Sequence, residues 1–576
     1  MPRVTDALLA LLLLFALPFF AWKAWRRLQL SMAKHPSLAG HSKMSKFASK
    51  LVPYYGLSDE HIFDCDGAPT EVASRRKQGF YRLAQHFRMR APTSIRLAEE
   101  LESGISDLEF TNTYRVPFPF ARFVRENLKL GAFATRSRGV EIEDADGNVS
   151  IDVSGSYGVN VFGYDFYKEC MAAAAVRVGE LGPVLGPYHP LIAENVAALK
   201  EISGLDEVSF HMSGTEAVMQ AVRLARYHTR KPYLVEFCGA YHGWWDGVQA
   251  GVGNPRRTAD VLTLSEMSER TLRVLETRTD IACVLINPIQ AMHPNSSAPG
   301  DSTLFGSARS AAYNKQAYSE WLAQLRDVCT RRGIVMIMDE VFVGFRLARG
   351  GAQEYFGVRA DMVTWGKTLG GGYPVGVVCG RADLMKRFRP DHPADICFAR
   401  GTFNSHPYVM AAMNEFLRRI ESPEIREHYT HIDALWNERA ERLNHRLESA
   451  GLPVRVVNLC SIWTVLYQRP SRFNWMFQYY LRSEGLALSW VGSGRMIFSH
   501  NFTDETFEAV ADGFVRAAQA MEQDGWWWQG PRVTALGIKL QIAREVAGAL
   551  LGGSAKTGST APASASATAS HGSSDQ

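Results

Sequence analysis

Short apolar segments bounded by glycine alternate with helical stretches over residues 111–525, and this alternation constrains the fold more than any other feature of the sequence. The segments 281–286 and 334–338 are apolar throughout, and a third candidate strand spans 208–211. A strand without a polar face is typical of a parallel sheet that helices cover on both sides. The pattern therefore predicts an α/β fold with a mostly parallel sheet.

The composition is close to that of an average soluble globular protein, with 46% apolar and 21% charged residues. It excludes a disordered, collagen-like or coiled-coil chain, and a single long apolar run excludes a polytopic membrane protein. The 63 basic and 59 acidic residues leave a net charge of +4, which does not indicate a nucleic-acid partner. The eight cysteines are scattered, so neither a disulfide framework nor a metal site is predicted, and a reducing cytosolic environment fits the main part of the chain.

The single long apolar run lies near the N-terminus, where Ala7 to Trp22 carries no charge and the run reaches Trp25 if Lys23 snorkels. Nineteen helical residues cover about 28 Å, nearly the thickness of a bilayer core. We therefore expect a membrane anchor, although a cleaved signal peptide and a buried core helix are alternative interpretations. Basic residues follow the run and place the C-terminal side of the run in the cytoplasm: Lys23, Arg26, Arg27 and Lys34.

The chain divides into five segments by composition. A tryptophan triplet at 526–528 opens an amphipathic stretch, and it either contacts a membrane interface or caps the protein's own core. The tail is rich in Gly, Ser, Ala and Thr and cannot bury enough surface to order itself. The predicted divisions are an anchor (1–28), an accessory or linker region (29–110), the main domain (111–525), the Trp-rich segment (526–551) and the tail (552–576).

Two small-residue segments are candidates for holding a phosphate and a flat ring. In His-Met-Ser-Gly-Thr-Glu-Ala, 211–217, a strand ends and a helix begins, and a helix N-terminus attracts phosphate. Ser-Gly-Thr at 213–215 is also an ordinary N-terminal cap of a helix. In the glycine-flanked loop 237–246, Tyr241 can stack on an aromatic cofactor, although Tyr-His-Gly is also a common turn.

Two further segments place an acid and a lysine at strand ends. Asp339 follows five apolar residues, and a buried carboxylate needs a partner such as a protonated ring nitrogen, a helix cap or an internal salt bridge. Lys367 stands between a strand end and the loop Gly-Gly-Gly-Tyr-Pro, 370–374. A restrained and partly desolvated lysine amine is a suitable Schiff-base nucleophile, whereas most lysines are solvated surface charges.

Taken together and in this order, the four segments resemble the class III (fold-type I) pyridoxal-phosphate aminotransferases, and within them the glutamate-1-semialdehyde aminomutases. The likeness is strongest over 339–385, in Asp-Glu-Val-Phe-Val-Gly-Phe-Arg, Gly-Gly-Ala-Gln-Glu-Tyr-Phe-Gly-Val and Gly-Lys-Thr-Leu-Gly-Gly-Gly-Tyr-Pro-Val-Gly, and it extends over about 111–525. It implies a large domain at about 165–405 with a mixed, mostly parallel sheet. It also implies a smaller C-terminal α+β domain built from the flanking segments.

The resemblance implies roles residue by residue. Lys367 forms the Schiff base with pyridoxal 5'-phosphate, Asp339 pairs with the pyridinium nitrogen and Tyr241 stacks on the ring, so these three are the catalytic set. Thr402 reaches the phosphate of the neighbouring subunit, which requires a homodimer with shared sites. The remaining cofactor contacts are Ser213, Gly214 and Thr215 at the phosphate and Gln290 near the phenolic oxygen.

Three departures from the aminomutase pattern lie toward the substrate rather than the cofactor: Asn287-Pro288, Gly-Ser-Tyr at 155–157 and Gly-Pro-Tyr-His-Pro at 186–190. Tyr157 then belongs to an altered substrate wall. Arg495 lies where many class III aminotransferases keep an arginine for the substrate carboxylate, a role that suits its bidentate fork, although a surface arginine is an equal alternative.

These features predict an aminotransferase that moves an amino group from an amino-acid donor to a carbonyl acceptor. The anchor indicates a lipophilic or carrier-bound acceptor. An aminomutase-type isomerase is the second hypothesis. A membrane-tethered, non-catalytic binding or scaffold protein is the third, and the presence of both Lys367 and Asp339 argues against it.

Overall fold

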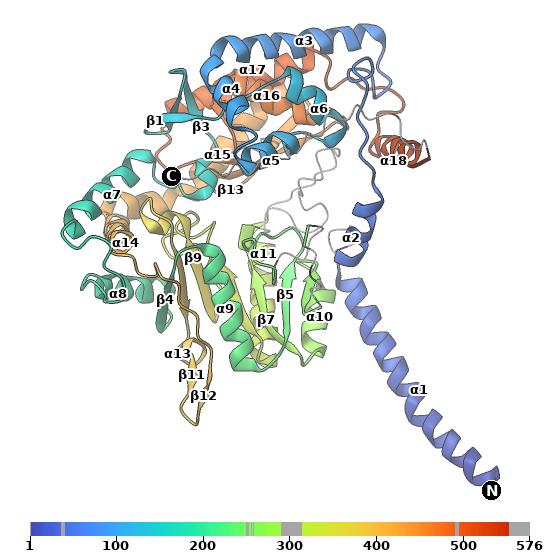
Figure 1. Cartoon of the computed structure of the whole chain (residues 1–576), viewed down its shortest axis with the longest axis vertical. Helices are drawn as coiled ribbons and strands as arrows, with labels where there is room; N and C mark the ends of the chain where they lie inside the picture. Colours follow the sequence, from blue (N-terminus) through green and yellow to red (C-terminus); the bar gives the residue numbers. More distant parts are fainter. Residues whose placement is uncertain are drawn as a thin grey trace, which may run out of the picture.

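The computed structural model describes residues 2–35, 41–248, 253–254, 256, 259–289, 314–489 and 495–551. The seven-stranded sheet of its larger part has the order β4-β10-β9-β8-β7-β5-β6 (Figure 1). β10 runs antiparallel to both neighbours and every other pair is parallel, so the prediction of a mixed, mostly parallel sheet is confirmed. The strands are β4 (Glu207–His211), β5 (Tyr233–Phe237), β6 (Val261–Leu264), β7 (Ile281–Ile286), β8 (Val335–Asp339), β9 (Met362–Gly366) and β10 (Gly376–Gly380).

The continuous apolar character of β7 and β8 arises because both faces of the sheet are covered. Successive side chains of a strand point to opposite faces. Leu285 and Ile337 accordingly pack in the cluster beneath α9 (Gly214–Thr229), whereas Val284 and Met336 join the core that includes α11 (Lys315–Arg332). Other elements of the large part are α7 (Tyr164–Val178), α8 (Ile192–Ser203), α10 (Glu269–Thr277), α12 (Gly351–Phe356), α13 (Ala382–Met385), α14 (Pro407–Arg419) and the hairpin β11 (Phe388–Arg389) and β12 (His392–Ile396).

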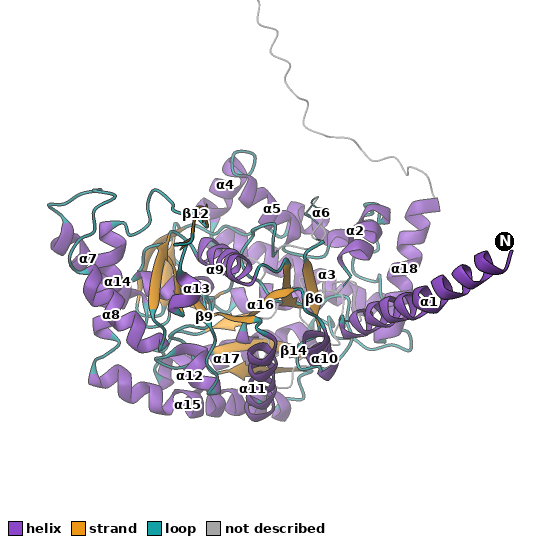
Figure 2. Ribbon diagram, turned by 90° about the horizontal axis from the view of Figure 1, so that it is seen from below, coloured by secondary structure: helices purple, strands orange, loops and turns teal. Residues whose placement is uncertain are grey.

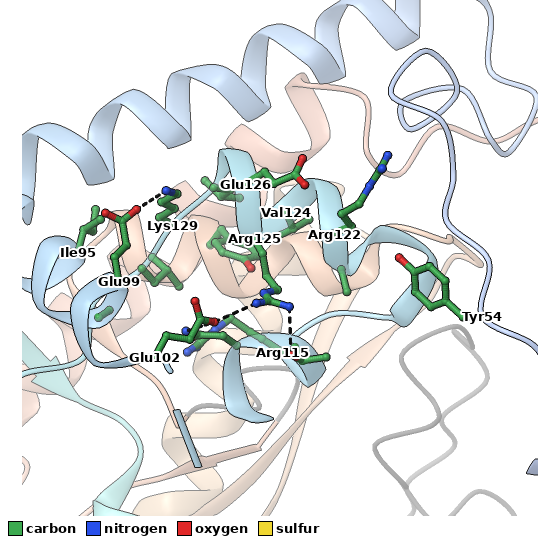
Figure 3. Close-up of a pocket in the computed structure, with 17 residues that line it drawn as sticks. Tyr54, Ile95, Glu99, Glu102, Arg115, Arg122, Val124, Arg125, Glu126 and Lys129 are labelled. Carbon is green, nitrogen blue, oxygen red and sulfur yellow. Dashed lines mark hydrogen bonds and ion pairs between the residues drawn. The ribbon is translucent and has the colours of Figure 1, made fainter. Parts of the chain in front are cut away.

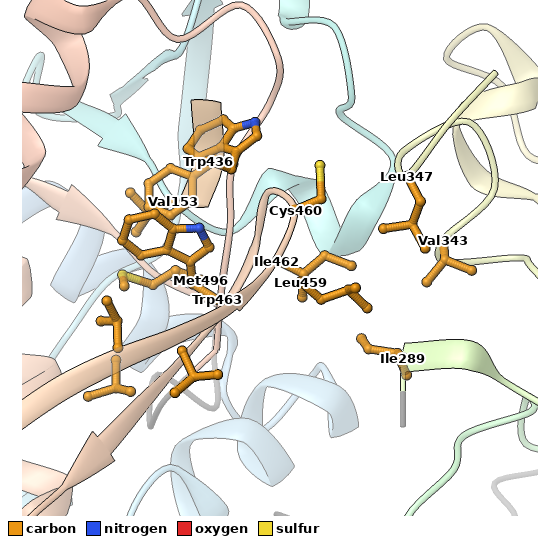
Figure 4. Close-up of a cluster of buried hydrophobic side chains, with 14 of the residues drawn as sticks. Val153, Ile289, Val343, Leu347, Trp436, Leu459, Cys460, Ile462, Trp463 and Met496 are labelled. Carbon is orange, nitrogen blue, oxygen red and sulfur yellow. The ribbon is translucent and has the colours of Figure 1, made fainter. Parts of the chain in front are cut away.

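A smaller part combines segments from both sides of the large one. The antiparallel strands β13 (Val454–Leu459), β14 (Ile462–Tyr467) and β16 (Arg495–Ile497) pack with α15 (Pro423–Ser449) and α17 (Asp504–Gln523). Trp436 and Trp463 lie in the same cluster as Val343 and Leu347, which follow β8, so one core runs between the two parts (Figure 4). A second sheet joins β1 (Ala134–Arg138), β2 (Glu141–Asp144) and β3 (Val149–Asp152) to β15 (Leu486–Ala487), which runs parallel to β3.

The N-terminal run forms the helix α1 (Pro2–Ala33), which extends away from the body (Figures 1 and 2). Its C-terminal end is attached, because Ala33 is buried and its carbonyl accepts a hydrogen bond from the Ser265 N–H at 2.9 Å. Within the described ranges, no helix is long and apolar enough to cross a membrane. The prediction of a membrane-spanning helix is not supported within these ranges.

The region between α1 and the main domain is a packed helical layer and not a spacer. α3 (Thr70–Arg90) lies against α16 (Phe477–Ser483), and Arg76 of α3 forms a fully buried ion pair with Asp66 at 2.8 Å. Trp526 and Trp527 are each 1% exposed, so they cap the protein's own core. Further helices of this layer and the C-terminal end are α2 (Ser42–Leu51), α4 (Pro92–Leu101), α5 (Ser106–Tyr114), α6 (Phe118–Asn127) and α18 (Ala535–Leu551).

Candidate active site

Lys367 is the first residue after β9 and opens a short 3-10 turn, Lys367–Gly370. Its φ of 48° lies in the left-handed region, which a non-glycine residue seldom adopts. Burial lowers the pKa of its ammonium group, and the charge of Asp339 opposes that shift. A lysine whose pKa is lowered carries more neutral amine at a given pH, which is the nucleophilic form.

Asp339 ends the neighbouring strand β8, and its carboxylate is 2% exposed. His242 Nδ1 lies 2.7 Å from Asp339 Oδ2, while the Thr364 hydroxyl and the Val341 N–H each donate to Oδ1 at 3.1 Å. These contacts offset the cost of burying a carboxylate. The adjacent acid Glu340 turns the other way and accepts from the N–H groups of Ala352 and Gln353, as a helix cap does.

The N-terminus of α9 forms a tight cradle beside these strand ends. Ser213 is the helix cap, and its hydroxyl accepts from the Glu216 N–H at 3.2 Å. At Gly214 a Cβ would stand 2.5 Å from Val341 Cγ1, and at Gly243, with φ 87°, it would stand 2.5 Å from Thr215 Oγ1. Only glycine permits these approaches, so the first turn of α9, the turn after β8 and the Tyr-His-Gly loop come together at one edge of the sheet.

Tyr241 flanks this edge with a side chain that remains 60% exposed. Burial raises the pKa of its phenol, and the negative charge of Asp339 raises it further. The ring of Tyr241 is therefore close enough to Asp339 to feel its charge, while one side stays open to a ligand.

The predicted substrate residues lie on adjoining segments. Tyr157, with φ 58° and a 54% exposed side chain, sits in the turn Gly155–Gly158, and at Gly158 a Cβ would stand 3.5 Å from Lys367 Cδ. The same turn packs on β16, whose first residue is Arg495. Thr402 is exposed on a loop, as a contact to a second subunit requires. Gln290 lies outside the described residues.

Comparison with known proteins decides the family. Residues 123–518 match the sequence model of the family described as aminotransferase class-III. The chain belongs to the class III aminotransferases. A glutamate-1-semialdehyde 2,1-aminomutase of Desulfotalea psychrophila is 33% identical over 369 residues, which cover 60% of this chain and 78% of the relative.

Solved structures of this family share the fold. An omega-transaminase from Sphaerobacter thermophilus is 27% identical with a TM-score of 0.58, covering 72% of this chain and 93% of that one. A glutamate-1-semialdehyde aminomutase from Pseudomonas aeruginosa PAO1 is 19% identical with a TM-score of 0.62, covering 78% and 99%, and supports the fold alone. The chain is thus a pyridoxal-phosphate enzyme of class III, and both aminotransfer and aminomutation fall within the family.

The described residues fit that cofactor. The glycine cradle at the α9 N-terminus leaves backbone N–H groups for a phosphate, and a buried acid and a desolvated lysine stand beside it. The buried Nε2 of His242 has no hydrogen-bond partner among the described residues, so the polar groups around Asp339 are not all satisfied by the protein.

Two residues of the site were missed by the sequence analysis. His242 was noted as part of a motif, but its contact with Asp339 joins segments 97 residues apart. Arg346 closes the motif that begins at Asp339, and it is fully buried. Its guanidinium donates to the carbonyls of Asn160 at 2.9 Å and Phe498 at 2.5 Å, and it thereby fixes the turn that carries Tyr157 against the smaller part.

Proposed function

We propose that this chain is an aminotransferase that takes an amino group from an amino-acid donor and delivers it to a carbonyl acceptor at Lys367. The observation that carries the proposal is the placement of Lys367 and the buried Asp339 on adjacent strand ends, beside the N-terminus of α9. Bound pyridoxal phosphate supplies an electron-withdrawing ring that stabilises negative charge on the carbon bonded to the amino nitrogen.

The chain's own residues hold the cofactor in position and move protons to and from the substrate. The Lys367 amine takes and returns the proton at the substrate carbon, because its lowered pKa brings the neutral and charged forms closer in free energy. Asp339, held by His242 and Thr364, keeps a proton at the ring nitrogen. The Gly214 and Thr215 N–H groups bind the phosphate, while the Ser213 hydroxyl is engaged in the helix cap.

The remaining roles complete the proposal. Tyr241 covers one face of the ring with its exposed side, and Gln290 stands near the phenolic oxygen. Thr402 reaches the phosphate of a second subunit, so the enzyme acts as a homodimer. Tyr157 and Arg495 lie on the substrate side, where Arg495 receives the donor carboxylate.

The test is a pair of half-reactions followed by visible absorbance. Single amino acids added to the holoenzyme should bleach the absorbance of the bound cofactor, and a carbonyl acceptor should restore it. If no amino acid from a broad panel bleaches the absorbance, the chain is not an aminotransferase.

A second candidate is an aminomutase, which the names of the curated relatives favour. An aminomutase isomerises one compound and needs no separate donor. Conversion of glutamate-1-semialdehyde to its isomer at a rate exceeding every donor–acceptor pair would select this function.

We also propose that the enzyme works at the cytoplasmic surface of a membrane on a lipophilic or carrier-bound acceptor. Aromatic side chains of α1 are exposed, including Phe19, Phe20 and Trp22, and Lys23 and Arg26 stack on Phe19 and Trp22. Aromatic and basic side chains together suit an interfacial helix. Deleting residues 1–28 should release the enzyme from sedimented membranes with its cofactor bound. A full-length protein already found in the supernatant would contradict this location.

A further inference from the structure

The outward face of α18 is apolar, although the helix lies at the surface of the molecule (Figure 1). Residues that follow one another at spacings of three and four share one face of a helix. Five residues of α18 follow these spacings and are exposed: Leu536, Leu540, Ala543, Ala547 and Leu550. Exposed apolar side chains that lie together mark a contact with a partner, whereas single ones do not.

The inward face fixes α18 to the body. Ile538 is buried, and the Glu545 carboxylate accepts from the buried Arg472 guanidinium at 2.6 and 2.9 Å. Glu545 is the only acid of the helix, so the outward charges of α18 are the exposed basic side chains of Lys539 and Arg544. At 3.6 residues per turn these two flank the apolar stripe on either side.

The helix α2 repeats this arrangement. Met44, Phe47 and Leu51 follow one another at spacings of three and four, and each is at least half exposed. The helix contains no acid, and its lysines have the same spacing on the adjacent face: Lys43, Lys46 and Lys50. Basic and apolar side chains combined in this way are typical of a helix that lies in the interface of an anionic membrane.

The two helices lie on the same side of the molecule, beside the end of α1 that joins the body (Figures 1 and 2). The segment after α2 is attached to α18, because the Tyr55 hydroxyl donates to the Glu545 carboxylate at 3.1 Å. The exposed side chains of α2 and α18 form the α2–α18 surface. Trp526 and Trp527, which precede α18, are buried in the core and do not belong to it.

Acids of the adjoining helices are matched by other cations. Tyr54, three residues after α2, lines a cavity of about 540 Å³ among α4, α5 and α6 (Figure 3). In the wall of this cavity Glu99 pairs with Lys129, and Glu102 pairs with Arg125 at 3.2 Å. These carboxylates are balanced within the wall, so they do not neutralise the lysines of α2.

The excess of cations decides which partner fits the α2–α18 surface. A second copy of the chain seated on the same surface would bring like charges together, which disfavours that pairing. A bilayer that contains anionic lipid attracts the cations and also takes up the exposed apolar side chains.

We propose that the α2–α18 surface docks the body of the protein on a bilayer that contains anionic lipid. Phe47 and the leucines of α18 enter the boundary between head groups and acyl chains, and the lysines lie against the anionic head groups. This inference rests on the membrane location proposed above and adds a second contact to α1. Few apolar side chains enter the bilayer, so the surface binds reversibly by itself and holds firmly only together with α1.

The test places a polarity-sensitive fluorophore on α18 of the full-length holoenzyme. All eight native cysteines are buried, so Leu540→Cys supplies one accessible thiol for labelling. With vesicles of phosphatidylcholine and phosphatidylserine, the emission should shift to shorter wavelength, and nitroxide-labelled lipid should quench it. Met89→Cys is the matched control, because Met89 is equally a surface residue but lies at the end of α3 that joins α4, and its label should stay in water.

A charge variant tests the lysines. Lys50→Gln combined with Lys539→Gln should weaken binding to the same vesicles about twentyfold, because each lysine near an anionic surface contributes about fivefold. Binding to pure phosphatidylcholine vesicles should not change. Lys200→Gln combined with Lys386→Gln removes the same charge from exposed positions of the large part and should leave both affinities unchanged.

The outcomes separate this inference from the proposals on which it rests. If the protein binds vesicles while the label at residue 540 stays in water, α1 alone holds the enzyme and the α2–α18 surface is wrong. If the label shifts without lipid as the protein concentration rises, a second copy covers α18 and the surface is equally wrong. Absence of any binding to anionic vesicles overturns both the surface and the membrane location. If the label enters the bilayer but no amino acid bleaches the cofactor absorbance, the aminotransferase proposal fails and the surface stands.

Discussion

Lys367 combines burial, a left-handed backbone conformation and a nearby carboxylate, which a surface lysine lacks. Lys367→Ala should abolish turnover and the visible absorbance of covalently held cofactor, because no other amine replaces it at the strand end. Circular dichroism and Tm should show an intact fold. Lys386→Ala, in an exposed segment, is the control and should retain both properties. Normal activity in Lys367→Ala would show that Lys367 is not the lysine that binds the cofactor.

Asp339→Asn tests whether the carboxylate has a chemical or only a structural role. Asparagine preserves the size and can still accept from Thr364 and the Val341 N–H, so cofactor binding should persist. Turnover should fall about a hundredfold or more, because a neutral partner no longer holds a proton at the ring nitrogen. Single-turnover kinetics with an amino-acid donor measures this step, and a near-native rate would show that the carboxylate only supports the fold.

Sequence reasoning located Lys367, Asp339 and Gly214 because strand ends of a parallel sheet meet at one edge, whatever the connections between them. The contact of His242 with Asp339 was not predictable in this way. It depends on how a glycine-flanked loop folds over the α9 N-terminus, which no local pattern specifies.

At the scale of elements, the cap that Glu340 forms on α12 should make stability depend on pH. Burial raises the pKa of this carboxyl from 4.5 to about 7, although the Ala352 and Gln353 N–H groups lower it. The native state then binds the proton more tightly than the unfolded state. The stability that Glu340 contributes is fully present below pH 4.5 and is lost as pH rises through about 7.

Glu340→Gln should remove this dependence, since the amide does not titrate in this range. Between pH 4.5 and about 7, the wild type should lose stability relative to the variant as pH rises. The difference between their free energies of unfolding should change by up to about 1.4 kcal/mol per pH unit. Urea unfolding at several pH values measures the difference, in which the other titrating groups cancel. A difference that stays constant with pH would contradict the assignment.

The strands β7 and β8 were predictable because their apolar runs reflect burial on both faces. The accessory helices were not, because amphipathic periodicity shows that a helix has an apolar face without showing which partner covers it. The N-terminal run was predicted to be helical from its apolar length, and it forms the helix α1.

For the whole molecule, the buried side chain of Arg76 connects the N-terminal helical layer to the C-terminal part of the chain. The Arg76 guanidinium bonds both oxygens of Asp66 at 2.8 Å and the carbonyl of Gly525 at 2.9 Å, and it stacks on the Phe473 ring at 4.5 Å. Residues far apart in the chain therefore meet at this side chain, which is 0% exposed. Its position indicates that the accessory layer and the C-terminal end unfold together.

Arg76→Ala should accordingly destabilise the protein by about 3 to 5 kcal/mol, because it leaves the Asp66 carboxylate buried without its partner. Arg96→Ala removes an exposed helix pair with Glu100 and should change stability by less than about 1 kcal/mol. Denaturant unfolding, followed both by tryptophan fluorescence and by the absorbance of bound cofactor, compares the two variants. If Arg76→Ala unfolds the layer while the cofactor signal keeps its wild-type midpoint, the accessory layer is an independent unit. Coincident midpoints, both lowered, would show that the layer and the catalytic part are a single cooperative unit.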